Sequence, residues 1–266
     1  MDSTKFKSDP YNSSNCYIQA SDVLNVMKTL GLSCKIKDLS IYQRAFVHKS
    51  YTELKDYEEY ERPEGYMDLF KESYETMEFL GDSLLGSVVS AYLYQRYVPN
   101  FKVDEGFLTK LKIRLVCGEQ LGYLSHELGF SKFMIISKHI DDNCSGRQNV
   151  HILEDIYEAF LGAIYLDTGD SHLVEQFILR SVVVHVDMVE LISKDNNYKD
   201  QILRYFQHNF KVHPTYTCSK DEVTNQFICK ILRDDDLVEF GEGVTKKKAE
   251  QDASRKALLH YHVISA

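Results

Sequence analysis

Three kinds of segment are missing from this sequence. No two of the six cysteines form a C-x-x-C pair, so zinc-ligand spacing is absent, and a disulfide framework is not expected in a chain of 266 residues. The first residues contain no apolar stretch of the kind found in a secretory signal. Apolar runs such as residues 84–94 are too short and too interrupted to span a bilayer. We therefore expect reduced thiols, a cytoplasmic, reducing compartment and no membrane partner.

Proline is also scarce, with four in the chain, and only Pro63 and Pro99 fall between residues 36 and 192. Apolar residues recur there mostly at helical spacing, and long strand-like alternations are lacking. This pattern predicts one helical domain over residues 34–192, preceded by an N-terminal extension over residues 1–33.

Two segments depart from the helical pattern. Residues 1–20 are polar and predict an irregular tail, followed by a short helix that Ser21-Asp22 would cap and that runs through Leu30, where Gly31 would end it. The acidic, tyrosine-rich stretch from Glu53 to Glu72 contains a proline and a glycine, and predicts a solvated surface insertion.

The pattern changes after the polar segment Ser193–Asn197, which is the best candidate for a linker. A helical stretch at residues 199–210 is followed by three short strand-like runs and then by a last helix from Thr245 to Tyr261. The order α-β-β-β-α predicts a small α+β domain over residues 196–263.

Positive charge is spread unevenly along a chain whose formal net charge is −9. Residues 196–266 hold 11 Lys or Arg and 10 Asp or Glu, which leaves 20 basic and 30 acidic residues in the rest of the chain. A phosphate-binding surface needs Lys and Arg because affinity for nucleic acids comes largely from neutralising phosphates. The acidic total therefore does not exclude a nucleic-acid partner, which we expect at the C-terminal domain.

Two sets of carboxylates stand at helical spacing. Glu75, Glu78 and Asp82 are placed at i, i+3 and i+7, on one helix face, and Asp155 and Glu158 repeat the i, i+3 spacing further along the chain. Apolar residues surround both sets, so these acids should lie beside or within the core, and the glycine next to Asp82, Gly81, allows close helix approach. Carboxylates held there repel one another unless a cation joins them, and Mg²⁺ prefers such hard oxygen ligands.

The motifs around these acids resemble those of the ribonuclease III family. E-T-M-E-F-L-G-D-S-L-L-G, from Glu75, resembles the family signature, and E-D-I-Y-E-A-F-L-G-A-I-Y-L-D-T-G, from Glu154, resembles its second acidic motif. Between them D-E-G-F-L-T-K-L-K, from Asp104, is similar to the family's intervening segment, and A-F-V-H-K-S-Y, from Ala45, to its opening motif. Order and spacing agree over residues 36–190. The long insertion before the signature resembles ribonuclease III-like chains of large DNA viruses and fungi.

The resemblance implies a fold, a reaction and a set of residues. The fold is an all-α ribonuclease III catalytic domain followed by the small α+β domain. The reaction is hydrolysis of phosphodiester bonds in double-stranded RNA with Mg²⁺, which Mn²⁺ can replace, leaving 5′-phosphates and short 3′ overhangs. The implied metal-binding and catalytic acids are Glu78, Asp82, Asp155 and Glu158, and the implied accessory acids are Glu75 and Glu105.

The resemblance also implies a homodimer, because two catalytic domains are needed to give each RNA strand its own site. Phe79, between two of the metal acids, matches the phenylalanine that such dimers insert into the partner. Simple packing of Phe79 in the core is an alternative.

The segment G-E-G-V-T-K-K-K-A-E, from Gly241, resembles the end of a double-stranded-RNA-binding domain. Lys246, Lys247 and Lys248 fall in the first turn of the last helix, where backbone N–H groups already favour anions. The three lysines are therefore candidate phosphate contacts on a domain that reads the shape of A-form RNA.

Further RNA contacts are expected from Gln201 and Arg204 in the domain's first helix and from Asn225 in the loop after its first strand. Arg204 stands where the family usually has a glutamate, and the loop K-D-E-V-T-N-Q lacks the usual G-P-x-H. Both departures predict weaker RNA binding than in a standard domain of this type.

A second function is kept as an alternative. The same sequence could belong to a protein that binds and sequesters double-stranded RNA, for example a silencing suppressor, and uses the nuclease fold as a dimerisation scaffold. The presence of all four acids favours the enzyme.

Overall fold

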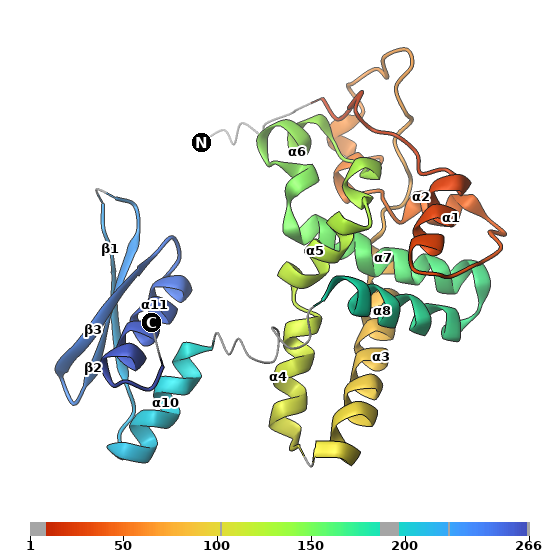
Figure 1. The fold of residues 1–266 in the computed structure, drawn as a ribbon. Coiled ribbons are helices and arrows are strands. Elements are labelled where there is room, and N and C mark those ends of the chain that lie inside the picture. Colours follow the sequence, from red (N-terminus) through yellow and green to blue (C-terminus); the bar gives the residue numbers. More distant parts are fainter. Residues whose placement is uncertain (1–8, 102, 187–196, 223, 265–266) are drawn as a thin grey trace. The chain divides into compact units, whose positions relative to one another are not determined.

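The structure is a computed structural model that describes residues 9–101, 103–186, 197–222 and 224–264. The chain divides into two compact units, Met1–Leu191 and Ile192–Ala266, and each is described by itself (Figure 1). The first unit is helical and the second has the order α-β-β-β-α, so the predicted fold class is confirmed. The domain bounds 1–33, 34–192 and 196–263 stay predictions, and the predicted linker lies, except for Asn197, outside the described residues.

The first unit consists of α-helices joined by short 3₁₀ turns. Its α-helices are α1 (Ala20–Thr29), α2 (Leu39–Arg44), α3 (Glu75–Phe101), α4 (Glu105–Leu115), α5 (Gly118–Glu127), α6 (Lys138–Asn143), α7 (Val150–Thr168) and α8 (Ser171–His185). Its 3₁₀ turns are η1 (Lys49–Tyr51), η2 (Lys55–Tyr57), η3 (Phe130–Phe133) and η4 (Gly146–Gln148). Over the described residues, no helix combines the length and the apolar character that crossing a membrane would require.

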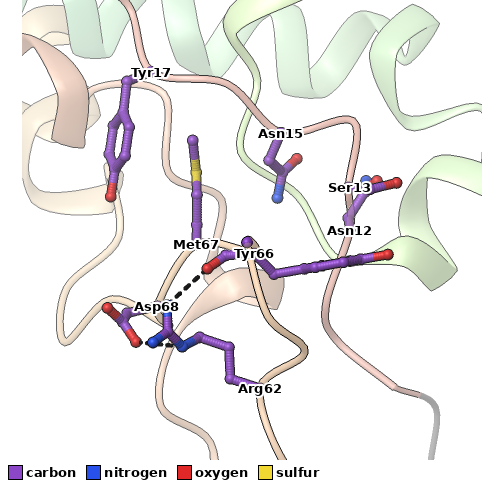
Figure 2. A pocket seen from close by; sticks show the side chains of 9 residues that line it. Asn12, Ser13, Asn15, Tyr17, Arg62, Tyr66, Met67 and Asp68 are labelled. Atoms are coloured by element: carbon purple, nitrogen blue, oxygen red, sulfur yellow. Dashed lines mark hydrogen bonds and ion pairs between the residues drawn. The ribbon is translucent and has the colours of Figure 1, made fainter.

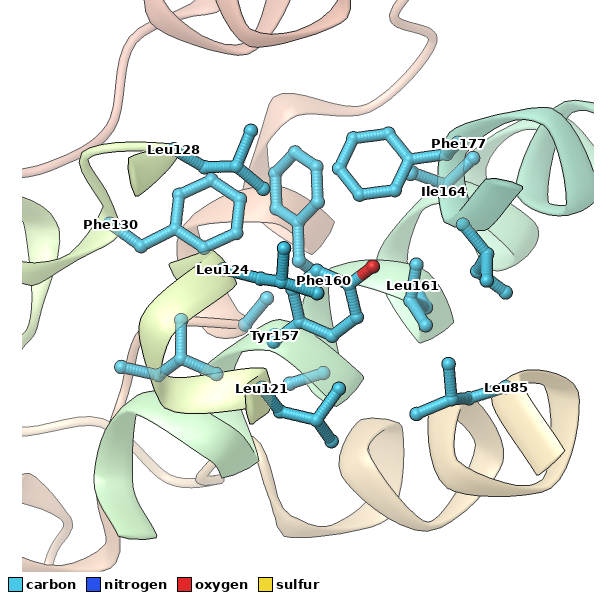
Figure 3. Close-up of a cluster of buried hydrophobic side chains, with 14 of the residues drawn as sticks. Leu85, Leu121, Leu124, Leu128, Phe130, Tyr157, Phe160, Leu161, Ile164 and Phe177 are labelled. Carbon is cyan, nitrogen blue, oxygen red and sulfur yellow. The ribbon is translucent and has the colours of Figure 1, made fainter. Parts of the chain in front are cut away.

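Helix α7 is the central element of this unit. The Asn149 side chain caps its first turn by accepting a hydrogen bond from the His151 N–H, and Gly169, with φ of 70°, ends it in the left-handed conformation that glycine adopts easily. Most of its side chains are buried, and it packs against α3, α5 and α8. Phe160 lies in an aromatic group whose ring centroids are 4.7 Å (Phe130) and 5.5 Å (Phe177) away (Figure 3). The core therefore holds α7 in place on several sides.

The N-terminal segment is packed against the helical unit. Of the predicted irregular tail, residues 1–8 lie outside the described residues, and Ala20 belongs to α1. Residues 9–19 have no helix or strand, as predicted, but Tyr11, Asn12 and Ile18 are buried. Helix α1 begins at Ala20 with Gln19 as its N-cap, so the predicted cap at Ser21-Asp22 is wrong. Gln19 and Asp22 form the capping box that closes the first turn. Its buried Val23 and Met27 belong to the same hydrophobic core as α7.

The predicted insertion is largely exposed, although part of it is anchored. Glu53 to Arg62 contain the short turn η2, and a bridge between Thr52 and Phe70 closes the base of the insertion. Tyr66, Met67 and Phe70 pack against the small buried cluster of Tyr11, Val47, Tyr51 and Ile135. Its aromatic residues thus hold an otherwise solvated loop on the surface.

Over its described residues, the second unit packs two helices on one three-stranded sheet. Its elements are α10 (Tyr198–Asn209), β1 (Thr215–Lys220), β2 (Phe227–Arg233), β3 (Asp236–Gly243) and α11 (Lys246–His260). The strands are antiparallel in the order β1-β2-β3. Ile202, Phe206, Ile231 and Leu258 form the core between the sheet and the helices. Gly241 of β3 lies so close to Ala253 that a Cβ atom there would overlap the α11 backbone.

Two cysteines of this unit depart from the expectation. Cys218 on β1 and Cys229 on β2 stand directly opposite each other and are joined in a disulfide, so the prediction that the thiols are reduced is wrong for this pair. The reason is tertiary, because the pairing of strands brings together residues that are separated by a loop in the sequence. Cys16, Cys34, Cys117 and Cys144 are free.

Candidate functional site

Helices α3 and α7 cross at two glycines. A Cβ atom on Gly81 of α3 would overlap the backbone oxygen of Glu158, and one on Gly162 of α7 would overlap the backbone oxygen of Met77. The two helix backbones are therefore in direct contact, which only glycine permits at these positions. The predicted close approach at Gly81 is confirmed, and the crossing brings the two carboxylate sets together.

The four predicted metal acids form one group, which we call the acidic cluster: Glu78 and Asp82 from α3, and Asp155 and Glu158 from α7. Glu158 is the most buried, with 8% of its surface exposed, whereas Glu78 and Asp155 are partly buried and Asp82 is exposed. The negative charges of the other three all act on Glu158. The expectation that the acids lie beside the core holds for three of them, and Asp82 lies on the surface.

Burial and mutual repulsion shift the pKa values of carboxylates in the acidic cluster. Burial, then the charges of Asp82 and Glu154, raises the pKa of Glu158 to about 8. Burial, then the charges of Asp155 and Glu75, raises the pKa of Glu78 to about 7. Burial also raises the pKa of Asp155. These three carboxylates, Glu78, Asp155 and Glu158, are thus held where the ionised form is disfavoured, and perturbations of this kind concentrate at functional sites.

Three residues that sequence reasoning missed belong to this site. The buried Tyr74 donates a hydrogen bond from its hydroxyl to Asp155 Oδ2 at 2.8 Å. Glu154 adds negative charge that raises the pKa of Glu158 and Glu78. The positive charge of Lys49 lowers the pKa of Glu78 and Asp155. Lys49 and Glu154 lie within recognised motifs and Tyr74 directly precedes one, and these positions were the only signal available.

The two accessory acids lie in different surroundings. Glu75 is at the edge of the acidic cluster, 3.3 Å from Lys49 Nζ, and its charge raises the pKa of Glu78. Glu105 is exposed in the first turn of α4, where its Oε1 accepts a hydrogen bond from Thr109 at 2.7 Å. Among the described residues, Glu105 makes no ion pair or hydrogen bond with the acidic cluster. The structure therefore places Glu75 at the edge of the acidic cluster, whereas the described contacts of Glu105 are made elsewhere, with Thr109.

The donor set of the acidic cluster fits a hard divalent cation. Its carboxylates are crowded and partly desolvated, and a cation would relieve both penalties. In the part of the chain that the structure describes, the one group of three potential ligand atoms lying within 4.8 Å of one another is Cys218, Cys229 and Glu250, and its sulfurs are bonded to each other. The acidic-cluster oxygens are more widely spaced, which suits an ion that keeps several water ligands, as Mg²⁺ does.

Phe79 does not pack in the core. It lies on α3 between Glu78 and Asp82 and is 77% exposed. The alternative of simple core packing is therefore wrong. A large apolar side chain this exposed beside a polar site is available for contact with another molecule.

The predicted RNA-binding lysines are where the sequence placed them. Lys246, Lys247 and Lys248 form the exposed first turn of α11, which Thr245 caps by accepting a hydrogen bond from the Lys248 N–H at 3.2 Å. Gly243 packs so close to this turn that a Cβ atom would overlap the Ala249 nitrogen. The turn is thus held against the end of β3 while its lysine side chains face solvent.

The other predicted RNA contacts lie on two further elements of the same unit. Gln201 and Arg204 are on α10, where Arg204 pairs with Asp200 at 2.5 Å. Asn225 is exposed in the β1–β2 loop with φ of 58°. The pairing with Asp200 offsets part of the positive charge that Arg204 would offer to a phosphate, and the weaker RNA binding expected from this position stays a prediction.

A separate surface pocket of about 410 Å³ lies between the N-terminal segment and the insertion (Figure 2). Arg62, at its rim, is bonded to Tyr66 O at 2.8 Å and to Asp68 at 2.9 Å. Asn15 bonds the backbone of Ile136 through both ends of its amide. These polar groups already have partners within the protein, and the pocket contains none of the acidic cluster.

Comparison with known proteins agrees with both units. A family model described as "Ribonuclease-III-like" matches residues 38–186, and one described as "Double-stranded RNA binding motif" matches residues 198–261. The first match covers more than half of the chain and includes all of the acidic cluster. The second includes the α11 lysines.

Relatives that match most of this chain occur in bacteria and in a virus. The chain is 33% identical over 250 residues to "Probable ribonuclease 3" of Acanthamoeba polyphaga mimivirus, covering 89% of this chain and 45% of that protein. It is 33% identical over 228 residues to "Ribonuclease 3" of Zunongwangia profunda, covering 85% of this chain and 86% of that protein. The nuclease domain of ribonuclease III from Campylobacter jejuni aligns with 64% of this chain and 97% of its own at 25% identity and a TM-score of 0.49. The chain belongs to the ribonuclease III family of endoribonucleases and carries a double-stranded-RNA-binding motif in its second unit.

Proposed function

We propose that this protein is a homodimeric endoribonuclease that hydrolyses phosphodiester bonds of double-stranded RNA with Mg²⁺ and leaves 5′-phosphates and short 3′ overhangs. The observation that carries the proposal is the burial of Glu158 against three other carboxylates at the crossing of α3 and α7. Such an arrangement destabilises the folded protein unless the acids bind a cation, so its presence favours a metal site over a structural role.

Enzymes of this family depend on a divalent metal, and the acidic cluster fits one. Glu78, Asp82, Asp155 and Glu158 would hold it, and the oxygen-only donor set favours Mg²⁺, with Mn²⁺ as a substitute. When bound, such an ion neutralises charge on the phosphate and lowers the pKa of a water ligand. The chain's own contribution is to fix four carboxylates on two helices whose backbones touch, so that the acids cannot separate to relieve their repulsion.

The second unit would supply most of the affinity for the duplex. Lys246, Lys247 and Lys248 are exposed on one helical turn and can reach phosphates across a groove, and Gln201, Arg204 and Asn225 are further candidates. Acidic residues outnumber basic ones in the first unit, which disfavours the binding of RNA phosphates there. The exposed lysines of the second unit would supply the positive charge that the duplex requires.

The decisive test compares cleavage of long double-stranded RNA by wild type and by Glu158→Gln and Asp82→Asn, with Mg²⁺, with Mn²⁺ and with EDTA. Glu175→Gln, a partly exposed glutamate on α8 outside the acidic cluster, is the control. We expect metal-dependent cleavage by wild type and by the control, and a loss of at least about 100-fold in both cluster variants. Binding without cleavage in either metal would refute the nuclease and favour the RNA-sequestering alternative.

The end chemistry has its own readout. Products ligated only after phosphatase and kinase treatment, or lacking a 3′ overhang on sequencing, would contradict the proposed 5′-phosphate and staggered cut.

The role of the α11 lysines is tested by salt dependence. Lys247→Ala should weaken RNA binding and reduce the slope of log K against log salt by about 1, because each lysine–phosphate contact releases condensed counterions. Lys35→Ala, an exposed lysine in the first unit, is the control. An unchanged slope in Lys247→Ala would remove this lysine from the interface.

The homodimer is supported by the exposure of Phe79 beside the acidic cluster. Phe79→Ala should shift the wild-type dimer toward monomer in analytical ultracentrifugation, because a buried aromatic anchor carries a large share of interface energy. Phe101→Ala is a matched control, since Phe101 is 67% exposed at the other end of the same helix. A monomeric wild type, or a Phe79→Ala dimer as stable as wild type, would contradict the assignment.

We propose the cytoplasm as the compartment, from the four free thiols. The Cys218–Cys229 disulfide would then be exposed to cellular reductants. Thiol alkylation and mass spectrometry of the protein from its source cells would decide the state of the pair.

A further inference from the structure

Tyr74 connects the opening motif, α3 and α7. Its backbone N–H donates to Val47 O at 2.9 Å, and its backbone oxygen accepts from the N–H groups of Met77 and Glu78 at the start of α3. Its side chain, 1% exposed, extends to α7, where the hydroxyl donates to Asp155 Oδ2 at 2.8 Å. One residue thus joins the beginning of the helix that carries Glu78 to a carboxylate on the other helix.

The hydrogen bond between Tyr74 and Asp155 has a defined direction. The phenol O–H of Tyr74 is the donor, because a carboxylate oxygen can only accept. The ring is fixed by packing, with its centroid 5.9 Å from that of the His48 imidazole. A donor with a fixed backbone and a buried ring holds its acceptor in one orientation.

The two carboxylate oxygens of Asp155 therefore differ in their hydrogen bonding. Oδ2 is engaged by Tyr74, and within the described part of the chain no hydrogen bond to Oδ1 is found. The hydrogen bond therefore fixes the plane of the Asp155 carboxylate before a cation binds, and Oδ1 remains available to bind that cation. Groups that orient a ligating carboxylate in this way commonly change metal affinity by about 10- to 100-fold when removed.

We propose that Tyr74 is a positioning residue for the metal site, holding Asp155 through its hydroxyl so that the carboxylate meets the cation without prior reorientation. The inference rests on the proposed function, because it presupposes that Asp155 binds a metal. Tyr74 touches neither substrate nor metal in this role and acts through Asp155 alone.

The chain offers a closely matched control. Tyr42, also fully buried, donates its hydroxyl to Asp167 Oδ2 at 3.3 Å, and Asp167 lies on α7 as Asp155 does but outside the acidic cluster. Tyr42→Phe and Tyr74→Phe therefore remove the same atom from the same kind of pair on the same helix. General damage to α7 would weaken metal binding in both variants, whereas loss of a positioning role would weaken it only in Tyr74→Phe.

The experiment measures Mn²⁺ binding to the whole protein by electron paramagnetic resonance of the free ion, without RNA. We expect Tyr74→Phe to weaken Mn²⁺ binding about tenfold and Tyr42→Phe to leave it within twofold of wild type. In cleavage assays, Tyr74→Phe should need about tenfold more metal for half-maximal activity, while its kcat at saturating metal stays close to wild type.

A double-mutant cycle separates positioning from a loss of folding. In the Asp155→Asn background, Tyr74→Phe should have little further effect on Mn²⁺ binding, because its role passes through that carboxylate. Equal effects in both backgrounds, or equal Mn²⁺ affinity of Tyr74→Phe and wild type, would overturn the proposal. A wild type that binds no Mn²⁺ would instead contradict the proposed function, so the two failures are distinguishable.

Discussion

The buried Glu158 carboxyl leads to a quantitative prediction about stability and pH. The pKa of this group is about 8 in the folded protein against an ordinary value of 4.5, which applies to the unfolded chain. Because the folded-state value is the higher one, the group favours folding fully below pH 4.5, and this contribution is lost as the pH rises through 8. One pKa unit is worth about 1.4 kcal/mol, so at pH 8 the loss is on the order of 4 kcal/mol.

Glu158→Gln removes this titration while keeping the size and shape of the side chain. In metal-free buffer at pH 8 we expect the variant to have a free energy of unfolding about 2–4 kcal/mol above that of wild type. The lower end allows for the amide, which must find hydrogen-bond partners in the same partly buried site. At pH 5 the difference should fall to about 1 kcal/mol or less, because Glu158 is then protonated in the folded wild type.

The assay is urea unfolding followed by far-UV circular dichroism in EDTA at pH 5, 6.5 and 8, with the partly exposed Glu175→Gln as the control. Glu78 titrates in the same direction, so the quantity to compare is the difference between variant and wild type at each pH. Mg²⁺ should stabilise wild type more at pH 8 than at pH 5 and should stabilise Glu158→Gln less. If variant and wild type lose stability in parallel between pH 5 and 8, the assigned burial and repulsion are wrong.

Two further predictions concern packing and the disulfide. Gly81→Ala should destabilise the first unit by about 2–3 kcal/mol and reduce cleavage, because its methyl group overlaps the Glu158 backbone. Gly106→Ala is the control, because the nearest atom that its added Cβ would meet outside the adjacent residues is 3.6 Å away. Its thermal unfolding should show no loss of stability. Similar behaviour of the two variants would contradict the contact between α3 and α7. Cys218→Ser should destabilise the second unit by up to about 3 kcal/mol, the value for closing a loop of this length. A chain without this bond under non-reducing conditions, seen as two additional alkylated thiols by mass spectrometry, would refute the pairing.

The acidic cluster shows what spacing alone can predict. Because side chains three, four and seven residues apart share a helix face, the sequence was enough to put Glu78 and Asp82 on one face and Asp155 and Glu158 on another. The same local logic identified the three strands of the second unit and the exposed lysine turn of α11. These are properties of one segment at a time.

Relations between segments required the tertiary structure. Spacing contains no information about which helix will cross α3, so it could not show that Tyr74 would reach Asp155 or that Glu154 would add its charge to Glu158. Exposure is decided in the same way, since Phe79 is apolar yet 77% exposed. The disulfide arises because strand pairing places Cys218 opposite Cys229, although nothing in their spacing marks them as partners.

The sequence by itself therefore determined the helical and α-β-β-β-α units, the four acids and the basic turn, since each depends on local periodicity and on motifs that span a single element. The tertiary structure alone decided how the acids act together. Burial and neighbouring charge set the pKa of Glu158 near 8, and both depend on the backbone contact at Gly81 and Gly162, which joins residues far apart in the chain.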